Sequence, residues 1–220
     1  MFLDNIDRIF YGTGDKNENG ETFEEFLKKY NPDLYEKPSC TVDMIVIRCD
    51  GRLERFDQKK QILLIKRKNH PCIGMWSCPG GFIEIKENII DAARRELEEE
   101  TGIKNLPMQQ LLTYGKYDMD PRMRVITTPF LSLIEGDAAV KAGDDAEDAA
   151  WFDITLENSG NLYHLELEKE DWHIEADMLE VKEKHSLLPQ TRYELIRSSN
   201  MDECHCTMII EALVYLKERL

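Results

Sequence analysis

One stretch of the chain, GFIEIKENIIDAARRELEEETGI (residues 81–103), constrains the fold more than any other. Its apolar residues recur at helical spacing from about Asn88 to Thr101, and Gly102 follows where a helix commonly ends in the left-handed conformation. A helix with a single apolar stripe must bury that stripe against another element. The stripe consists of Ile90, Ala93 and Leu97. Short apolar runs on both sides are typical of strands, so we expect an α/β fold in which this helix covers a sheet.

The flanking segments predict most of that sheet. Val42–Cys49 and Gln61–Lys68 are rich in aliphatic residues, and Asp50-Gly51 after the first of them is typical of a hairpin turn. The remaining expected elements are strands at about Met108–Tyr117, Arg124–Ile134 and Ala149–Phe152, a hairpin formed by Leu162–Glu168 and Trp172–Val181, and two helices that close the chain.

Prolines and changes of pattern divide the chain into three parts. Thr22 and Glu25 have the spacing of a capping box and predict a short helix at Phe23–Tyr30, after which Pro32 and Pro38 mark a linker. We therefore expect an N-terminal segment with a short helix at 1–37, a core domain at 38–153, and a hairpin and helical extension at 154–220 that packs on the core.

The charge balance limits the partners. Asp and Glu number 43 against 28 Lys and Arg, and the resulting net charge of −15 repels a polyphosphate backbone and argues against nucleic-acid binding. No apolar run reaches the roughly 18 residues that span a bilayer, and acids stand where a signal peptide carries positive charge, so we expect no membrane association. The six cysteines form no CxxC pair, which predicts reduced thiols in the cytoplasm.

Three acidic residues of the predicted helix share one face. At 100° per residue, Glu96, Glu99 and Glu100 fall within an arc of about 100°. Like charges at this spacing repel one another, and most acidic triplets are nevertheless plain solvated surface. An oxygen-rich anionic face also suits Mg²⁺ or Mn²⁺ better than a softer metal, which makes a metal site the alternative interpretation.

The spacing of the whole stretch decides between these alternatives. It fits G-x5-E-x7-R-E-U-x-E-E-x-G-U, in which U is a bulky aliphatic residue, without a gap. From average residue frequencies, a chance match somewhere in the chain has a probability of about one in a million. The pattern is the Nudix box, and the chain resembles a Nudix hydrolase. The matching positions are Gly81, Glu87, Arg95, Glu96, Leu97, Glu99, Glu100, Gly102 and Ile103.

The resemblance covers residues 38–153, and the flanks of the box are most similar to the ADP-ribose pyrophosphatase-like group. KPSCTVDMIVI and LLIKRKNHPCIGMWSCPGGF resemble the front half of such domains, and YGKYDMDPRMRVITTPFLSL resembles the back half. The resemblance implies an α/β/α sandwich around a mixed sheet and a homodimer. It also implies metal-dependent hydrolysis of a nucleoside diphosphate linked to another moiety, with ADP-ribose or a similar nucleotide sugar as the small-molecule substrate.

Site residues follow from the resemblance. Glu96, Glu99 and Glu100 match the family's metal carboxylates, and the carbonyl group of Gly80 is a further expected ligand of Mg²⁺ or Mn²⁺. Two further box residues, Glu87 and Arg95, match a pair that holds the loop on the helix and so orients the metal ligands.

The general base stays open at this stage. In many relatives it is an acid on a downstream loop, where this chain has DDAED, and Glu99 or Glu100 offers an alternative. The loop candidates are Asp144, Asp145, Glu147 and Asp148, of which we take Glu147 into the candidate catalytic set.

Substrate contacts are expected around the same loop. Arg122 and Arg124 are candidates for phosphate binding because a guanidinium group can bind two phosphate oxygens at once, and surface ion pairing is an equally good interpretation of both. Gly80 and Gly81 form the loop against which a substrate would lie, and Phe82 either packs in the core or stacks on an adenine base.

Two other functions compete with hydrolysis of a nucleotide sugar. One is a sensor that binds ADP-ribose or another nucleotide without turnover, and the other is a housekeeping enzyme that cleaves nucleoside triphosphates. A sensor would more often have lost a box glutamate, and this chain retains all of them.

Overall fold

The computed structural model describes residues 6–138, 140, 146–184, 187 and 190–220, and it consists of two compact units, Met1–Lys37 and Pro38–Leu220. The first unit contains a 3-10 helix, η1 (Arg8–Tyr11), and the helix α1 (Phe23–Lys29). The capping box of α1 is present, since Thr22 Oγ1 accepts from Glu25 N–H at 3.3 Å and Glu25 Oε2 accepts from Thr22 N–H at 2.8 Å.

The second unit is built on one mixed sheet, in which β1 and β6 are parallel and the other pairs are antiparallel. The path through the sheet is β10-β9-β8-β7-β2-β1-β6-β5, with β3 paired to β2 and β4 paired to β1. The strands are β1 (Ser39–Cys49), β2 (Lys60–Arg67), β3 (Trp76–Ser77), β4 (Gly80–Phe82), β5 (Gln109–Gln110), β6 (Val125–Glu135), β7 (Ala146–Ser159), β8 (Leu162–Lys169), β9 (Trp172–Lys182) and β10 (Thr191–Ser198).

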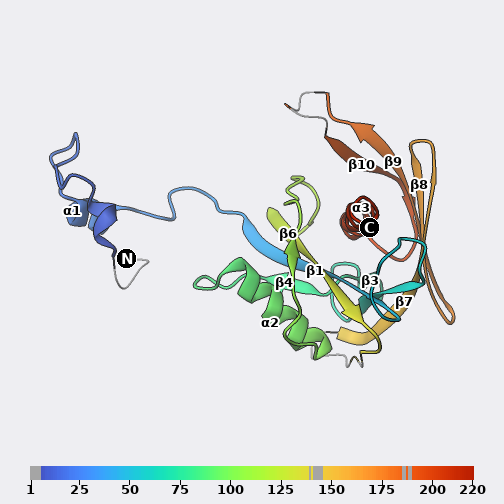
Figure 1. The fold of residues 1–220 in the computed structure, drawn as a ribbon. Coiled ribbons are helices and arrows are strands. Elements are labelled where there is room, and N and C mark those ends of the chain that lie inside the picture. The colour runs from blue at the N-terminus through green and yellow to red at the C-terminus, as the bar shows by residue number, and fades with distance from the viewer. Residues whose placement is uncertain (1–5, 139, 141–145, 185–186, 188–189) are drawn as a thin grey trace. The chain divides into compact units, whose positions relative to one another are not determined.

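The two faces of the sheet each bury a helix, as the alternation along β1 requires. Met44 and Val46 belong to a buried cluster that includes Leu97 of α2 (Ile89–Thr101). Ile45 and Ile47 belong to another cluster that includes much of α3 (Glu203–Lys217). The helices therefore cover opposite faces (Figure 1), and the expected α/β/α arrangement with its mixed sheet is confirmed.

Several boundaries differ from the sequence-based expectations. The connection from β1 to β2 runs over residues 50–59 and buries Leu53, so Asp50-Gly51 is not a two-residue hairpin turn. The strand expected at Met108–Tyr117 is reduced to β5 and an isolated bridge from Tyr114 to Thr127. The first of the two expected closing helices is instead the edge strand β10.

No helix in the described ranges is both long enough and apolar enough to cross a membrane.

Candidate active site

The predicted box lies where β4 leads into α2. Strand β4 pairs with β1 so that Gly80 faces Asp43 and Gly81 faces Val42. A Cβ atom added to Gly80 would lie 2.3 Å from the carbonyl oxygen of Val42, and one added to Gly81 would lie 2.4 Å from the carboxyl carbon of Glu96. Gly80 needs to be glycine because it packs directly against the backbone of β1, whereas a side chain at Gly81 would first have to displace the Glu96 carboxylate. Helix α2 then begins after its N-cap, Asn88, and ends at Gly102, whose φ of 75° is left-handed.

Glu100 is the buried acid of the site. The residue is 9 % exposed, and its carboxylate accepts a hydrogen bond of 2.7 Å from the backbone N–H of Gly80. The pKa of Glu100 is raised to about 8, mainly by burial and in smaller part by the negative charges of Glu96 and Asp43, against the opposite effect of the Gly80 N–H. A cation bound next to Glu100 would stabilise its ionised carboxylate.

Arg95 holds three other acids of the site in place. Its guanidinium group binds both carboxylate oxygens of Glu87, each at 2.9 Å, and the Phe82 carbonyl at 3.0 Å, which ties the loop to the helix. The same group contacts Glu96 Oε1 at 2.8 Å and Glu99 Oε2 at 3.1 Å. The Arg95 hydrogen bonds lower the pKa of Glu87, whereas burial is the main cause of the raised pKa of Glu96.

The donor set at α2 fits a hard divalent cation. Its three carboxylates and the Gly80 carbonyl all offer oxygen atoms that could bind such an ion, and the Glu96 carboxylate lies directly against the Gly81 backbone. Within the described ranges, the carboxylate oxygens of Glu96, Glu99 and Glu100 do not all lie within 4.8 Å of one another. Arg95 draws the first two acids toward itself while the Gly80 N–H holds the third, which accounts for this wider spacing.

Replacing Gly80 by alanine is expected to push β4 away from β1, because the new Cβ would lie 2.3 Å from the carbonyl oxygen of Val42. We expect a loss of about 1–3 kcal/mol in the free energy of unfolding from this overpacking, measured by urea titration. Gly115→Ala is the matched control, since the nearest atom to its Cβ, on Arg124, would lie 3.6 Å away in ordinary contact. Equal stability of the two variants would contradict the close packing of Gly80 on β1.

A partly buried charged group not predicted from the sequence lies behind the loop. The His205 Nδ1 atom contacts Asp202 Oδ2 at 2.5 Å, and Nε2 lies 3.4 Å from Asp43 Oδ1. Asp43 also accepts a hydrogen bond from the hydroxyl group of Thr127. Because Asp43 faces Gly80 across the β1–β4 pair, His205 supports the loop that carries the candidate metal ligand.

One signal in the sequence points to Asp43. It is the single acid among the otherwise apolar residues of VDMIVI, and an acid in a strand that is buried on both faces needs partners. Its partner His205 is far away in the sequence, so no local spacing relates the two residues.

The candidate base Glu147 lies at the beginning of β7 rather than on a loop. Its carboxylate forms an ion pair of 3.1 Å with Lys66, whose Nζ lies 5.1 Å from the centre of the Trp172 ring. Alternate residues of a strand point to the same face, so Lys66 shares a face with Ile62 and Leu64 of β2. Both belong to the cluster on the α3 side of the sheet, which places this ion pair on the side opposite α2. Asp148 pairs with Lys66 across β2 and β7, whereas Asp144 and Asp145 lie outside the described residues.

The candidate substrate residues are partly brought together. Arg122 binds Asp120 through two nitrogens, at 3.1 and 2.8 Å, and its guanidinium carbon lies 5.6 Å from the centre of the Phe82 ring. The Phe82 side chain is exposed rather than buried in the core. Arg124 instead donates to the carbonyl of Gly115 at 2.5 Å.

Comparison with known protein families decides the identity of the fold. The family described as NUDIX domain matches residues 49–177 of the chain. The chain belongs to the Nudix family. Nudix hydrolases generally need divalent metal ions, which agrees with the acid-rich face of α2.

Two relatives and one solved structure relate this Nudix chain to ADP-ribose. It is 42 % identical over 129 residues to an ADP-ribose pyrophosphatase of Methanocaldococcus jannaschii, an alignment that spans 58 % of this chain and 68 % of the relative. It is 34 % identical over 140 residues to the ADPR responsive transcriptional repressor NtrR of Acinetobacter baylyi, spanning 62 % of this chain and only 52 % of the repressor. The structure is the NUDIX domain of Shewanella oneidensis NrtR complexed with ADP ribose, with 29 % identity, a TM-score of 0.53, and coverage of 60 % of this chain and 82 % of that one.

Millimolar Mg²⁺ is expected to raise the melting temperature of this Nudix protein. A ligand at about 100 times its Kd stabilises the native state by about 2.7 kcal/mol, which for a domain of this size corresponds to about 5–10 °C. Differential scanning fluorimetry with and without the ion measures the shift. The shift should fall below about 2 °C in Glu100→Gln, and no shift in the unmodified protein would count against a metal site at these acids.

Proposed function

We propose that the chain is a divalent-metal-dependent pyrophosphohydrolase that acts on ADP-ribose or a similar nucleotide sugar. The observation that carries the proposal is Glu100, a buried carboxylate with a raised pKa, held by one backbone N–H next to Glu96 and the glycine loop. The identity of 42 % with an ADP-ribose pyrophosphatase supports the choice of substrate.

The proposed reaction is hydrolysis of the phosphoanhydride bond. Water adds its oxygen to one phosphorus atom, the bridging P–O bond breaks, and ADP-ribose yields AMP and a phosphorylated ribose. A bound Mg²⁺ or Mn²⁺ would screen the pyrophosphate charge, polarise a P–O bond and lower the pKa of water. Glu96, Glu99, Glu100 and the Gly80 carbonyl would hold this ion.

The other residues then have distinct proposed roles. Arg95, through its bidentate contact with Glu87, positions the ligand helix against the loop. We assign the proton-accepting role to Glu99 or Glu100, because the Glu147 carboxylate is paired with Lys66 on the opposite face of the sheet. Arg122 and Phe82 lie against each other and would contact a substrate phosphate and a base, respectively, with Arg124 as a further candidate.

A substrate screen with product identification tests the proposal. The purified full chain is incubated with Mg²⁺ or Mn²⁺ and, in separate reactions, with ADP-ribose, other nucleotide sugars, dinucleotides and nucleoside triphosphates, and the product masses are measured. We expect AMP and ribose phosphate from ADP-ribose at the highest kcat/KM. Faster hydrolysis of triphosphates would assign the chain to the housekeeping class instead.

A sensor is the second candidate because a repressor that responds to ADPR is 34 % identical to this chain. Calorimetry distinguishes it from an enzyme. Saturable ADP-ribose binding in the presence of Mg²⁺ without release of AMP would favour the sensor and overturn the hydrolase.

We also propose a cytoplasmic location and a homodimer. All six cysteines are free thiols, as expected in a reducing compartment. The homodimer rests on the family resemblance, and light scattering of the purified chain should give twice its mass of 25.7 kDa. A value of 25.7 kDa would contradict it.

A further inference from the structure

A second group of metal-ligating side chains lies far from the box, on strands β8 and β9. Their register places Glu166 directly opposite Glu175, with His164 opposite Asp177 and Glu168 opposite His173. The neighbours that point to the other face, such as Leu165 and Ile174, are buried in the cluster that includes α3. The polar residues therefore project from the face that α3 does not cover.

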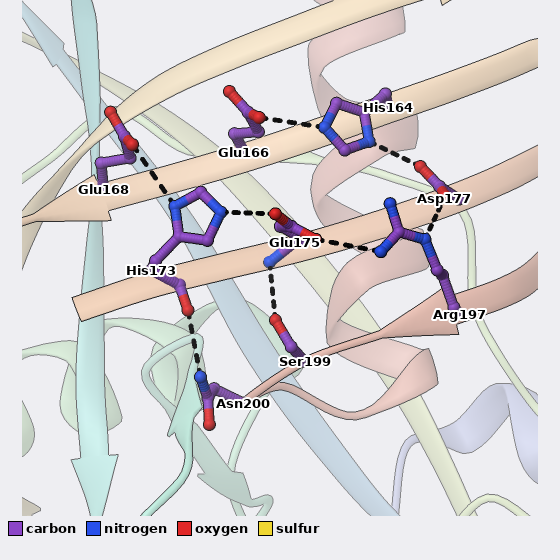
Figure 2. A network of polar contacts seen from close by, with 9 residues as sticks. All are labelled: His164, Glu166, Glu168, His173, Glu175, Asp177, Arg197, Ser199 and Asn200. Carbon is purple, nitrogen blue, oxygen red and sulfur yellow. Dashed lines mark hydrogen bonds and ion pairs between the residues drawn. The ribbon is translucent and has the colours of Figure 1, made fainter.

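Two acidic residues lie directly opposite each other in this group. Like charges directly opposite each other on neighbouring strands destabilise a sheet, and Glu166 and Glu175 form such a pair. The network in Figure 2 contains four carboxylates, one guanidinium group and two imidazoles. Arg197 contacts Glu175 Oε2 at 3.1 Å and also binds Asp177, so it does not offset the charges of all four acids. A further cation between Glu166 and Glu175 would relieve the repulsion.

Both histidines present the same ring atom to this acid pair. The Nδ1 atom of His173 faces Glu168 Oε1 at 3.3 Å, which leaves Nε2 toward Glu175 Oε1 at 2.7 Å. The Nδ1 atom of His164 faces Asp177 Oδ1 at 2.5 Å, which leaves Nε2 toward Glu166 Oε1 at 3.1 Å. A carboxylate on Nδ1 is the common second-shell partner of a metal-binding histidine, and a metal ion at Nε2 would replace the proton that each ring now shares with Glu175 or Glu166.

We propose that Glu166, His173 and Glu175 bind a transition-metal dication of the Zn²⁺ type, with His164 as a fourth ligand or as the residue that orients Glu166. One ligand atom from each of the first three residues lies within 4.8 Å of the others. Bonds of about 2.0–2.2 Å to Zn²⁺ place two ligand atoms about 3–4 Å apart, so small side-chain rotations complete the site.

The chemistry of the donors separates this site from the one on α2. Imidazole nitrogen combined with carboxylate oxygen favours Zn²⁺ or Co²⁺, whereas the all-oxygen set of the box favours Mg²⁺ or Mn²⁺. An ion held by ligands from both strands would cross-link β8 to β9.

Cobalt spectroscopy on the metal-free, untagged full chain tests the proposal. Co²⁺ is titrated at pH 7.5 and its visible d–d absorption is recorded, and Zn²⁺ is then added in competition. We expect one equivalent of Co²⁺ that Zn²⁺ displaces, with affinity reduced at least about 30-fold in the double variant His164→Gln/His173→Gln. Glu168→Ala should lose about 10–100-fold through the weakened orientation of His173.

Two controls make the result specific to this face. His70→Gln removes an exposed histidine elsewhere and should leave Co²⁺ affinity unchanged. Glu96→Gln/Glu100→Gln should also leave it unchanged, so that failure here is separate from failure of the proposed hydrolase site. Circular dichroism spectra establish that each variant is folded. Absence of a d–d band in the Glu96→Gln/Glu100→Gln variant, or a band that stays unchanged when His164→Gln/His173→Gln is added to that variant, would overturn the proposal.

Discussion

Replacing Glu100 by glutamine is expected to lower kcat for ADP-ribose hydrolysis by about 10³-fold, equivalent to about 4 kcal/mol of transition-state stabilisation. Glutamine keeps the shape of the side chain and an oxygen that can accept the 2.7 Å hydrogen bond from Gly80 N–H, but it removes the negative charge. Because burial disfavours the ionised acid, the free energy of unfolding should not decrease. Initial rates of AMP release at saturating Mg²⁺ measure the effect.

Glu98→Gln is the matched control on the same helix. Glu98 forms an ion pair of 2.5 Å with Lys104, and its side chain is about half exposed, so the change should alter kcat by less than about twofold. A kcat for Glu100→Gln within tenfold of the unmodified enzyme would show that the buried acid is not part of the reaction.

Replacing His205 by glutamine is expected to destabilise the fold by about 1–3 kcal/mol near pH 6.5, because it leaves two partly buried acids without their cation. Although burial alone would lower it, Asp202 and Asp43 raise the pKa of His205 to about 10. Burial raises the pKa of Asp202, but the positive charge of His205 outweighs this effect and lowers it. A histidine pKa above its unfolded value stabilises the fold fully below about pH 6.5 and loses that contribution as pH rises through 10.

The difference in unfolding free energy between the unmodified chain and His205→Gln should therefore shrink steadily from pH 6.5 to pH 10. Urea titrations at several pH values measure it. His70→Gln, a change on an exposed loop, should stay within about 0.5 kcal/mol of the unmodified protein at every pH. A pH-independent difference for His205→Gln would indicate that the imidazole is neutral in the folded protein.

Elements with strong local signals could be predicted from the sequence. The stripe of α2 and the glycine that ends it are local features, and the helix lies at Ile89–Thr101, within one residue of the expectation. The β8–β9 hairpin follows from its alternation of apolar and polar residues and is found at Leu162–Lys169 and Trp172–Lys182. In both cases neighbouring residues carry all of the information that the element needs.

Elements that depend on distant partners could not be predicted in the same way. Residues 191–198 form β10 because they pair with β9 at the edge of the sheet, where Tyr193 and Leu195 pack on the core. Residues 108–117 form little strand, since only short parts of this segment pair with β6. Tertiary pairing outweighs local pattern at both places.

Within the candidate site, too, residues close together in the sequence could be predicted and contacts between distant residues could not. The spacing of the box identifies Glu96, Glu99 and Glu100 because all three lie within two turns of one helix. The Asp43–His205 contact and the Lys66–Glu147 pair join residues far apart in the chain, so only the three-dimensional structure reveals them.

The central claim, that the carboxylates of α2 hold a divalent ion, is tested most directly by an anomalous difference map from crystals grown with Mn²⁺ and recorded near the manganese absorption edge. We predict a peak about 2.0–2.4 Å from carboxylate oxygens of Glu96 and Glu100 and from the Gly80 carbonyl oxygen. Crystals that show no peak at α2, with Glu96 and Glu99 still bound to Arg95, would contradict it.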